Sequence, residues 1–177
     1  MSSGYGHRRL SRGAGVRGYY SRYGRSGRSL KRRRGWRGCG GWHPLTGIEI
    51  DCKDMPDAIP ALAVLGSCAH GKTVLKNITA CRMKETDRCK SIVAELTKMG
   101  GKFEETPDSL TIYHAPLHGA TLNGHHDHRI VMASTCAALV ADGETLIDSA
   151  EHVGVSFPRF YEEMSKIGAN IIRLVEH

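Results

Sequence analysis

Apolar residues in the segment 44–177 recur with the two spacings that distinguish helices from strands. Apolar positions three and four residues apart predict four helices: Asp57–Ala69, Lys84–Met99, Asp127–Ala141 and Pro158–Ile167. Short β-branched or alternating runs predict six strands: Ile48–Asp51, Thr73–Leu75, Lys102–Glu105, Leu110–Tyr113, Thr145–Ile147 and Asn170–Leu174. Strands that alternate with helices indicate an α/β fold in which the helices pack against sheets.

Part of this pattern occurs twice along the chain. Residues 95–100 (Glu-Leu-Thr-Lys-Met-Gly) match residues 163–168 (Glu-Met-Ser-Lys-Ile-Gly) at a spacing of 68 residues. Residues 71–75 (Gly-Lys-Thr-Val-Leu) likewise resemble residues 143–147 (Gly-Glu-Thr-Leu-Ile). Two copies of a helix–strand–helix–strand unit explain both matches.

Basic residues are concentrated at the N-terminus. Residues 1–43 contain eleven Arg, one Lys and no Asp or Glu, which leaves 13 basic and 18 acidic residues in the segment 44–177. The net charge of +7 therefore describes neither part, and it is no evidence that the whole chain binds nucleic acid. Because residues 1–43 have hardly any aliphatic side chains, we expect this segment to be disordered.

Two origins fit the basic segment. Its Arg and Gly residues are interleaved with aromatic ones, as in RNA-binding tails, and a nucleic acid would then be a partner. An out-of-frame translation of GC-rich DNA gives the same composition, and the segment would then be unrelated to the rest. It has no apolar run of the ~7–15 residues that a secretory signal needs. No later segment reaches the ~18 apolar residues of a membrane span.

The cysteines contain no C-x-x-C pair; they are Cys39, Cys52, Cys68, Cys81, Cys89 and Cys136. Several lie among apolar neighbours in predicted helices, so we expect buried free thiols rather than disulfides or zinc ligands. Free thiols and the lack of a membrane segment indicate a cytoplasmic chain without a membrane partner.

Residues 66–73 (Gly-Ser-Cys-Ala-His-Gly-Lys-Thr) match the phosphate-loop pattern G-x-x-x-x-G-K-[ST]. In a nucleotide-binding loop this pattern follows a strand and opens a helix. Here the order is reversed, because a predicted helix precedes the pattern and a predicted strand follows it. Gly71 is better explained as the end of the helix. A P-loop nucleotide-binding protein is the weaker alternative, and it predicts ATP affinity that depends on Lys72.

Residues 125–128 (His-His-Asp-His) contain possible metal ligands. A zinc site needs three or four ligands that converge in space, and no second cluster of Cys, His or carboxylate residues is evident. We therefore expect a solvated loop here, and no metal site.

Charged residues gather where three predicted helices begin. Asp57 opens the first helix, residues 82–88 (Arg-Met-Lys-Glu-Thr-Asp-Arg) the second and residues 127–129 (Asp-His-Arg) the third. Helix N-termini have free N–H groups and the positive end of the helix dipole, so they attract anions. Lys84 and Arg88 would project from the same side of one helix. The spacing fits either a site for an anionic substrate or a helix surface of mutually screened charges.

Four segments resemble the C-terminal part of the EPSP synthase family, the 3-phosphoshikimate 1-carboxyvinyltransferases: 54–58, 82–88, 127–132 and 156–158. The step of 27 residues from Asp57 to Lys84 is also similar to that family. The Lys-Glu-Thr-Asp-Arg block separates it from the related UDP-N-acetylglucosamine enolpyruvyl transferases. The resemblance runs from about Gly47 to the C-terminus and excludes residues 1–43.

The resemblance implies transfer of the enolpyruvyl group of phosphoenolpyruvate to the 5-hydroxyl of shikimate 3-phosphate, with release of phosphate and without a cofactor. This is a step of the shikimate pathway, which leads to chorismate and the aromatic amino acids. It also implies the enolpyruvate transferase fold. In that fold each of two domains is an inside-out α/β barrel of three βαβαββ units, and residues 44–177 would form about two units of the second domain.

The same resemblance assigns the proton transfers. Asp57 would contact shikimate 3-phosphate and take the proton of its 5-hydroxyl. Glu85 would handle the proton at the methylene carbon of phosphoenolpyruvate, with Lys84 beside it and in contact with shikimate 3-phosphate. Lys84 should lower the pKa values of both carboxyl groups, whereas desolvation should raise them.

The resemblance also assigns anion-binding residues. Arg88 and Arg129 would bind phosphoenolpyruvate, because guanidinium groups match carboxylate and phosphate geometry. His128 would support Arg129 or assist proton transfer. Two positions depart from the family: Val155 stands where many members have a phosphate-binding Lys, and Ala80 where members often have an Asn that contacts shikimate 3-phosphate.

The active site of the family lies between its two domains, of which the resemblance covers part of one. We therefore expect no measurable transferase activity from this polypeptide alone, because positioning and water exclusion need both walls. The family is usually monomeric, but exposed apolar faces lead us to expect self-association here. The alternative to an enzyme is a non-catalytic RNA-binding protein that uses residues 1–43.

Overall fold

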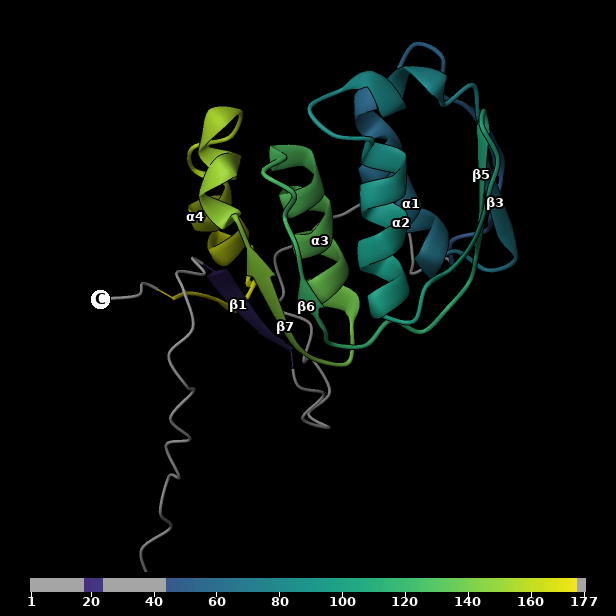
Figure 1. Cartoon of the computed structure of the whole chain (residues 1–177). Coiled ribbons are helices and arrows are strands. Elements are labelled where there is room, and N and C mark those ends of the chain that lie inside the picture. The colour runs from purple at the N-terminus through teal and green to yellow at the C-terminus, as the bar shows by residue number, and fades with distance from the viewer. Residues whose placement is uncertain (1–17, 24–43, 175–177) are drawn as a thin grey trace, which may run out of the picture.

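The computed structural model describes residues 18–23 and 44–174. Within these residues, two four-stranded sheets flank a layer of helices (Figure 1). The α-helices are α1 (Ile59–Cys68), α2 (Arg88–Lys98), α3 (His128–Val140) and α4 (Phe160–Lys166). Short 3-10 helices are η1 (Pro56–Ala58), η2 (Thr79–Met83) and η3 (Ala150–Val155). The expected α/β class is confirmed.

The first sheet has the strand order β2-β3-β5-β4. Its strands are β2 (Glu49–Asp51), β3 (Lys72–Lys76), β4 (Lys102–Glu105) and β5 (Ser109–Tyr113). β2 and β3 are parallel, whereas β3 with β5 and β4 with β5 are antiparallel. The predicted hairpin is confirmed as β4 and β5. Thr106 closes its turn, because its backbone N–H and its hydroxyl both bond to Ser109.

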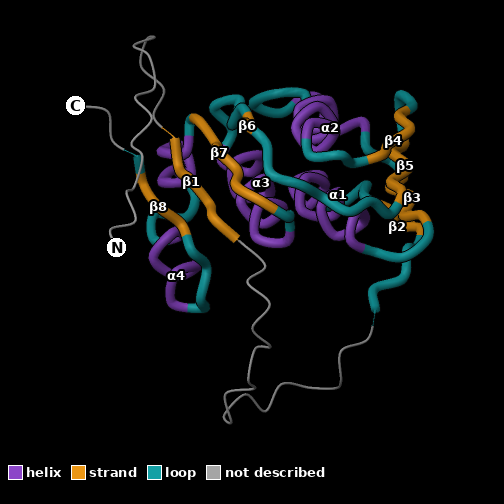
Figure 2. The backbone as a smooth tube through the Cα atoms, turned by 90° about the horizontal axis from the view of Figure 1, so that it is seen from below, coloured by secondary structure: helices purple, strands orange, loops and turns teal. Residues whose placement is uncertain are grey.

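The second sheet repeats this arrangement with the order β6-β7-β1-β8 (Figure 2). Its strands are β6 (Thr121–Leu122), β7 (Gly143–Asp148), β1 (Gly18–Tyr23) and β8 (Ile171–Arg173). β6 and β7 are parallel, and β1 is antiparallel to both β7 and β8. β1 therefore occupies the place in the second sheet that β5 occupies in the first.

The presence of β1 differs from the disorder expected for residues 1–43. Gly18–Tyr23 pairs with β7 along all six residues and with β8 along three. A strand between two others satisfies its backbone N–H and C=O groups on both edges, which composition alone does not reveal. The remainder of residues 1–43 lies outside the described part of the chain.

The repeated sequence segments occupy equivalent places in the two sheets. Gly47 packs so tightly against β3 that a Cβ atom would lie 2.1 Å from the carbonyl oxygen of Lys72. Gly119 packs in the same way against β7, where a Cβ atom would lie 2.1 Å from the carbonyl oxygen of Glu144. Glycine is required at both positions because any larger residue would collide with backbone.

α2 buries its predicted apolar face, whereas the apolar face expected for the first helix is wrong at Leu65, which is 52% exposed. Cys89, Ile92 and Leu96 of α2 are fully buried and belong to one core cluster with residues of α1 and α3. α1 and α3 present small residues to this core, such as Ala63 and Ala137. The core accounts for the helical periodicity of the sequence.

Two local predictions need correction. The second helix begins at Arg88 and not at Lys84, because Asp87 caps it: the Asp87 side chain accepts a hydrogen bond from the backbone N–H of Lys90 at 3.0 Å. The described cysteines are free thiols, but Cys136 is exposed and not buried. No helix in the described ranges is long and apolar enough to span a bilayer.

Candidate active site

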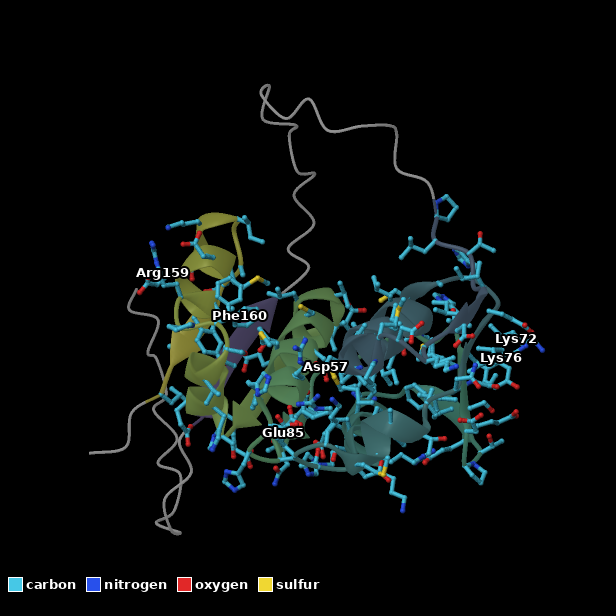
Figure 3. All side chains as sticks on the ribbon, turned by 90° about the horizontal axis from the view of Figure 1, so that it is seen from above. Asp57, Lys72, Lys76, Glu85, Arg159 and Phe160 are labelled. Atoms are coloured by element: carbon cyan, nitrogen blue, oxygen red, sulfur yellow. The ribbon has the colours of Figure 1, made fainter. Side chains whose placement is uncertain are left out.

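The N-termini of α1, α2 and α3 converge at one end of the helical layer. Asp57 lies in η1, which leads into α1, and Arg88 is the first residue of α2. Arg129 is the second residue of α3. Figure 3 shows Asp57 and Glu85 in the middle of the molecule, between the sheet that carries Lys72 and the helix that carries Phe160. The charged residues that the sequence places in three separate segments thus form one cluster.

Arg88 is the centre of this cluster. Its side chain is only 2% exposed. Its Nη1 atom lies 2.6 Å from Asp57 Oδ1, its Nε atom 2.7 Å from Asp127 Oδ2, and its Nη2 atom bonds to Glu85 Oε2. Burial alone would lower the pKa of Arg88, but the three carboxylates raise it. The interpretation as a solvated helix surface is wrong for Arg88, because its guanidinium is buried and each of its three nitrogens bonds to a carboxylate.

Asp127 is a residue that the sequence analysis leaves without a role. It is fully buried and caps α3, where its Oδ1 atom accepts a hydrogen bond from the backbone N–H of Arg129 at 2.8 Å. Its Oδ2 atom binds Arg88, and the Thr86 hydroxyl donates to the same oxygen at 3.4 Å. The available signal was an Asp directly before an apolar helix, which is typical of an N-cap.

Asp57 is shared by three cations. Besides Arg88, Arg129 Nη2 lies 3.2 Å from Asp57 Oδ2, and Lys84 Nζ lies 3.5 Å from Asp57 Oδ1. Burial raises the pKa of Asp57, but the positive charges of its three partners outweigh it and hold the pKa below its ordinary value. The carboxyl group is therefore ionised at neutral pH.

Arg129 keeps unused hydrogen-bonding capacity. Its Nε atom is buried and has no hydrogen-bond partner among the described residues. A buried donor without a partner costs free energy, so an acceptor is expected to occupy this place in the working molecule. His128 precedes Arg129 at the start of α3. Burial raises the pKa of Asp127, but the hydrogen bonds from Arg88 and the Arg129 N–H outweigh it, and His128 adds a smaller lowering effect.

Lys84 and Glu85 reach the cluster from a bend between η2 and α2. Lys84 has extended backbone dihedral angles, so it does not share a helix with Arg88 as the spacing predicted. Both side chains are accessible, with exposed fractions of 35% for Lys84 and 53% for Glu85. The bend lets Lys84 turn toward Asp57 while Glu85 binds Arg88. It places two charged groups where a bound molecule can touch them.

Arg82 holds this bend in place and was also missed. It contacts the turn of the β4–β5 hairpin through three atoms: Nη1 to Glu105 Oε1 at 2.5 Å, Nη2 to the Thr106 carbonyl at 2.7 Å and Nε to the Pro107 carbonyl at 3.0 Å. Nη1 also lies 3.3 Å from Asp87 Oδ2. The hairpin is therefore part of the support for the cluster.

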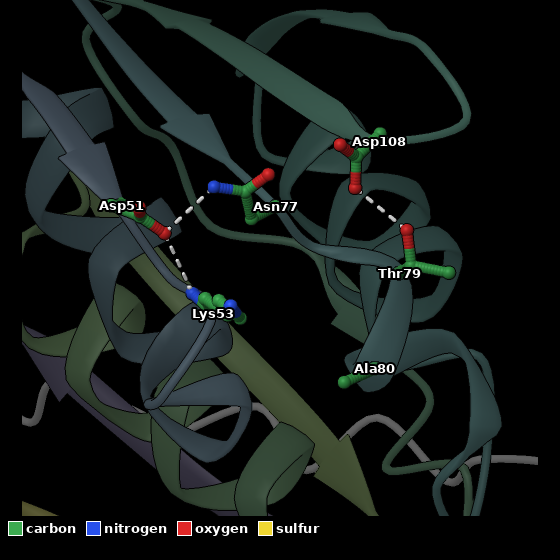
Figure 4. A pocket seen from close by; sticks show the side chains of 6 residues that line it. All are labelled: Asp51, Lys53, Asn77, Thr79, Ala80 and Asp108. Atoms are coloured by element: carbon green, nitrogen blue, oxygen red, sulfur yellow. Dashed lines mark hydrogen bonds between the residues drawn. The ribbon is translucent and has the colours of Figure 1, made fainter.

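The two positions that depart from the family lie in 3-10 helices, Val155 in η3 and Ala80 in η2. Val155 ends η3 and is 78% exposed, so it provides no charge there. Ala80 belongs to η2 and lines a pocket of about 460 Å³ (Figure 4). The other residues that line this pocket are polar: Asp51, Lys53, Asn77, Thr79 and Asp108. Asn77 bonds to Asp51 at 2.9 Å and Thr79 to Asp108 at 2.6 Å, so these groups are mutually fixed.

The structure accounts for the two motifs that the sequence analysis discounted, the phosphate-loop pattern at residues 66–73 and the His-rich segment at residues 125–128. Residues 66–73 run from the end of α1 into β3, and Gly71 has a φ of +85° just after the helix. This order is opposite to that of a phosphate loop. His125 bonds to Glu95, and His126 stacks edge-on against His152 with ring centroids 4.9 Å apart. The His-rich segment is thus held by protein contacts.

Comparison with known proteins identifies similar sequences and structures. The family model of EPSP synthase (3-phosphoshikimate 1-carboxyvinyltransferase) matches residues 27–164, which starts earlier than the expected limit near Gly47. The 3-phosphoshikimate 1-carboxyvinyltransferase of Methanocaldococcus jannaschii is 50% identical over 132 residues, which cover 74% of this chain and 31% of the relative. That of Methanocella arvoryzae is 49% identical over 127 residues, or 72% of this chain and 30% of the relative.

Solved structures show the same likeness. EPSP synthase from Acinetobacter baumannii superposes with a TM-score of 0.71 and 32% identity, over 75% of this chain and 32% of that one. The enolpyruvyl transferase NikO from Streptomyces tendae shares the fold, with a TM-score of 0.63 and 24% identity over 76% of this chain and 31% of that one. The chain thus spans about a third of the length of the curated relatives it matches.

Proposed function

The chain belongs to the EPSP synthase family, and on this premise we propose that its charged cluster takes part in enolpyruvyl transfer. The substrates are phosphoenolpyruvate and shikimate 3-phosphate, and the products are the enolpyruvyl ether and phosphate. In the addition step, the 5-hydroxyl oxygen bonds to C2 of phosphoenolpyruvate while C3 gains a proton. In the elimination step, the bond from C2 to the phosphate oxygen breaks and C3 loses a proton.

The observation that carries this proposal is the unpaired Nε of Arg129 beside an accessible set of cations. Phosphoenolpyruvate has a carboxylate and a phosphate. Both anions can accept two parallel hydrogen bonds from one guanidinium group. Arg129 and Lys84 are partly exposed, with exposed fractions of 38% and 35%. Arg88 is buried, and each of its three nitrogens bonds to a carboxylate, so it organises the cluster and leaves Arg129 and Lys84 as the cations that a substrate can reach.

Asp57 is the group we assign as the base for the 5-hydroxyl. It is ionised, because its cationic partners keep its pKa low, and it is 43% exposed. A substrate anion that binds Arg129 and Lys84 competes with Asp57 for these cations. Weaker pairing raises the pKa of Asp57 and strengthens it as a base at the moment when the substrate is bound.

Glu85 and Lys84 are assigned to the proton at the methylene carbon. Glu85 has one carboxylate oxygen on Arg88, and more than half of its side chain is accessible. Lys84 is on the same bend, and its ammonium group pairs with Asp57. Glu85 is linked to Asp57 through Arg88, and Lys84 and Arg129 both pair with Asp57, so we assign both groups a place beside the phosphoenolpyruvate that Arg129 would hold.

The cluster forms one open wall. Asp57, Glu85, Lys84 and Arg129 all have side chains at least one third exposed. Transfer chemistry that depends on charge stabilisation needs water to be excluded from the reacting groups. We infer that the opposite wall and the remaining ligands of shikimate 3-phosphate come from residues other than those described.

Titration of the chain with phosphoenolpyruvate tests the proposal. Nuclear magnetic resonance of the arginine Nε–Hε groups would report the contact directly, and Arg129 is expected to shift as the ligand binds. Arg129→Ala should weaken binding about tenfold or more, because charge-assisted hydrogen bonds are lost. Arg159→Ala is the matched control, since Arg159 is 65% exposed and pairs only with α4 residues in the described structure. Equal weakening by both variants, or no shift in the parent chain, would refute the proposal.

A further inference from the structure

Glu95 is a buried carboxylate outside the charged cluster. It lies on α2, two helical turns after Arg88, and its side chain is 2% exposed. Oε2 accepts a hydrogen bond from the backbone N–H of Asn123 at 2.8 Å, and Oε1 lies 2.9 Å from Nε2 of His125. Lys98 Nζ reaches both oxygens, at 2.9 and 2.7 Å. Glu95 thus fastens the loop before α3 to α2.

The ionised state of Glu95 fixes the proton of His125. Burial raises the pKa of Glu95, but the hydrogen bonds from Lys98, Asn123 and His125 outweigh it and lower the pKa. An ionised carboxylate only accepts hydrogen bonds, so His125 Nε2 must be the donor. The pair is therefore directional, from imidazole N–H to carboxylate.

The loop that Glu95 holds has an unfavourable backbone. His125 and His126 have φ angles of +52° and +53°, a region that residues with a side chain rarely adopt. Gly124 packs so closely that a Cβ atom would lie 2.5 Å from the carbonyl oxygen of Asp148. Such a conformation persists only where surrounding contacts enforce it. Asn123 and His125 provide the contacts with Glu95.

The loop ends at Asp127, which belongs to the charged cluster. Arg88 and Glu95 are seven residues apart on α2, so they lie on the same side of the helix. Arg88 binds Asp127 at one end of the loop, and Glu95 binds Asn123 and His125 at the other. A displacement of the loop would therefore move Asp127, the N-terminus of α3 and Arg129 with it.

The second copy of the sequence repeat shows what is special about Glu95. Glu163 occupies the equivalent position on α4, and Lys166 binds it at 2.8 Å, as Lys98 binds Glu95. The Glu163 side chain is 42% exposed, whereas that of Glu95 is 2% exposed. A buried ion pair needs further hydrogen bonds to offset its desolvation. In the described structure the loop donates such hydrogen bonds to Glu95, through Asn123 and His125. In the first copy of the motif the glutamate therefore also holds a loop.

We propose that Glu95 and His125 are positioning residues for the anion-binding cluster. They touch no substrate, and they act through the loop 123–127 by fixing Asp127 and, through it, Arg88 and Arg129. The proposal rests on the proposed function for the identity of the anion, phosphoenolpyruvate. Its structural part, the control of Arg88 geometry by Glu95, does not depend on that identity.

The test compares the parent chain with Glu95→Ala, Glu95→Gln and His125→Ala. Phosphoenolpyruvate titration should give dissociation constants about tenfold higher for Glu95→Ala and His125→Ala, because small misplacements of binding groups are costly. Glu95→Gln keeps an acceptor for the Asn123 N–H and should recover part of the loss. Glu163→Ala and Lys166→Ala are the controls, since each removes the Glu163–Lys166 ion pair of the second copy and leaves the contacts of Glu95 with the loop intact.

The Nε–Hε resonance of Arg88 is the readout that does not need the substrate. It should shift in Glu95→Ala and His125→Ala and stay unchanged in the two controls. If the parent chain binds no phosphoenolpyruvate, the proposed function fails, and this resonance alone decides the positioning role. An Arg88 resonance unchanged in His125→Ala, a variant that is expected to fold, would overturn the proposal. Equal effects in the controls would also overturn it.

Discussion

Arg88 and Asp127 form an ion pair with almost no access to solvent: Nε and Oδ2 are 2.7 Å apart, and the side chains are 2% and 0% exposed. The two residues are 39 positions apart in the sequence and start consecutive major helices, α2 and α3. Removal of one partner leaves the other buried with an uncompensated charge. The pair therefore couples the stability of the domain to the integrity of the charged cluster.

Asp127→Asn is expected to lower the free energy of unfolding by about 3 kcal/mol, because it breaks a buried pair while it keeps an oxygen for the helix cap. Urea denaturation followed by circular dichroism measures this change. Glu49→Gln makes the same chemical change in the exposed pair with Lys76 and should have little effect. Equal stability of the two variants would show that the Arg88–Asp127 pair does not matter for folding.

Gly119→Ala should lower the free energy of unfolding by about 2–3 kcal/mol, because the added methyl group overpacks a site bounded by backbone. The nearest atom, the Glu144 carbonyl oxygen, would lie 2.1 Å from the new Cβ. Gly154→Ala is the control, since nothing lies within 4 Å of its Cβ position. Thermal unfolding of both variants gives the comparison. A Gly119→Ala protein as stable as its parent would contradict the close approach of the segment before β6 to β7.

Deletion of residues 1–23 should increase self-association above that of the parent chain, because it removes β1 and exposes the facing edges of β7 and β8. Deletion of residues 1–17 keeps β1 and serves as the control. Size-exclusion chromatography at several protein concentrations distinguishes the two. If the chain without residues 1–23 associates no more than the chain without residues 1–17, β1 is dispensable for the second sheet.

Stability should fall in acid because two buried carboxyl groups have lowered pKa values. Burial raises the pKa of Asp127, but the hydrogen bond from Arg88 outweighs it and lowers that pKa. Burial likewise raises the pKa of Glu95, and hydrogen bonds from Lys98, Asn123 and His125 outweigh it. In the unfolded chain, Asp and Glu have pKa values of about 3.9 and 4.3. The stabilisation is therefore complete above these values and is lost as the pH falls through the lower folded ones. Urea midpoints between about pH 7 and 3 should decline less steeply in Asp127→Asn, and an identical decline would count against this origin.

The chain by itself should release no phosphate from phosphoenolpyruvate and shikimate 3-phosphate. Asp57 and Glu85 are 43% and 53% exposed, so water competes at the groups that must move protons. A phosphate-release assay measures turnover, and the Methanocaldococcus jannaschii enzyme, a relative of about three times the matched length, serves as the positive control. Turnover by the chain alone would show that the open wall is sufficient for catalysis.

Periodicity in the sequence determined the existence of the helices and most strands, because each element buries one face and that face repeats at a fixed local spacing. α3 was predicted within one residue at each end. The charged residues at helix starts also followed from local chemistry. Their convergence around Arg88 is a property of the structure, whereas their roles in proton transfer and anion binding remain proposals.

The tertiary structure decided what depends on contacts between distant segments. β1 pairs with strands more than 100 residues away, and nothing in the composition of residues 1–43 announces it. The start of α2 moved from Lys84 to Arg88 because Asp87 caps the helix, and Arg82, which is bonded to the β4–β5 hairpin, lies 3.3 Å from Asp87 Oδ2. Glu95 and Glu163 lie in similar local sequences, yet Glu95 is buried beneath a loop and Glu163 is 42% exposed. Local spacing records which face of an element is apolar, but it cannot record which partner will cover that face.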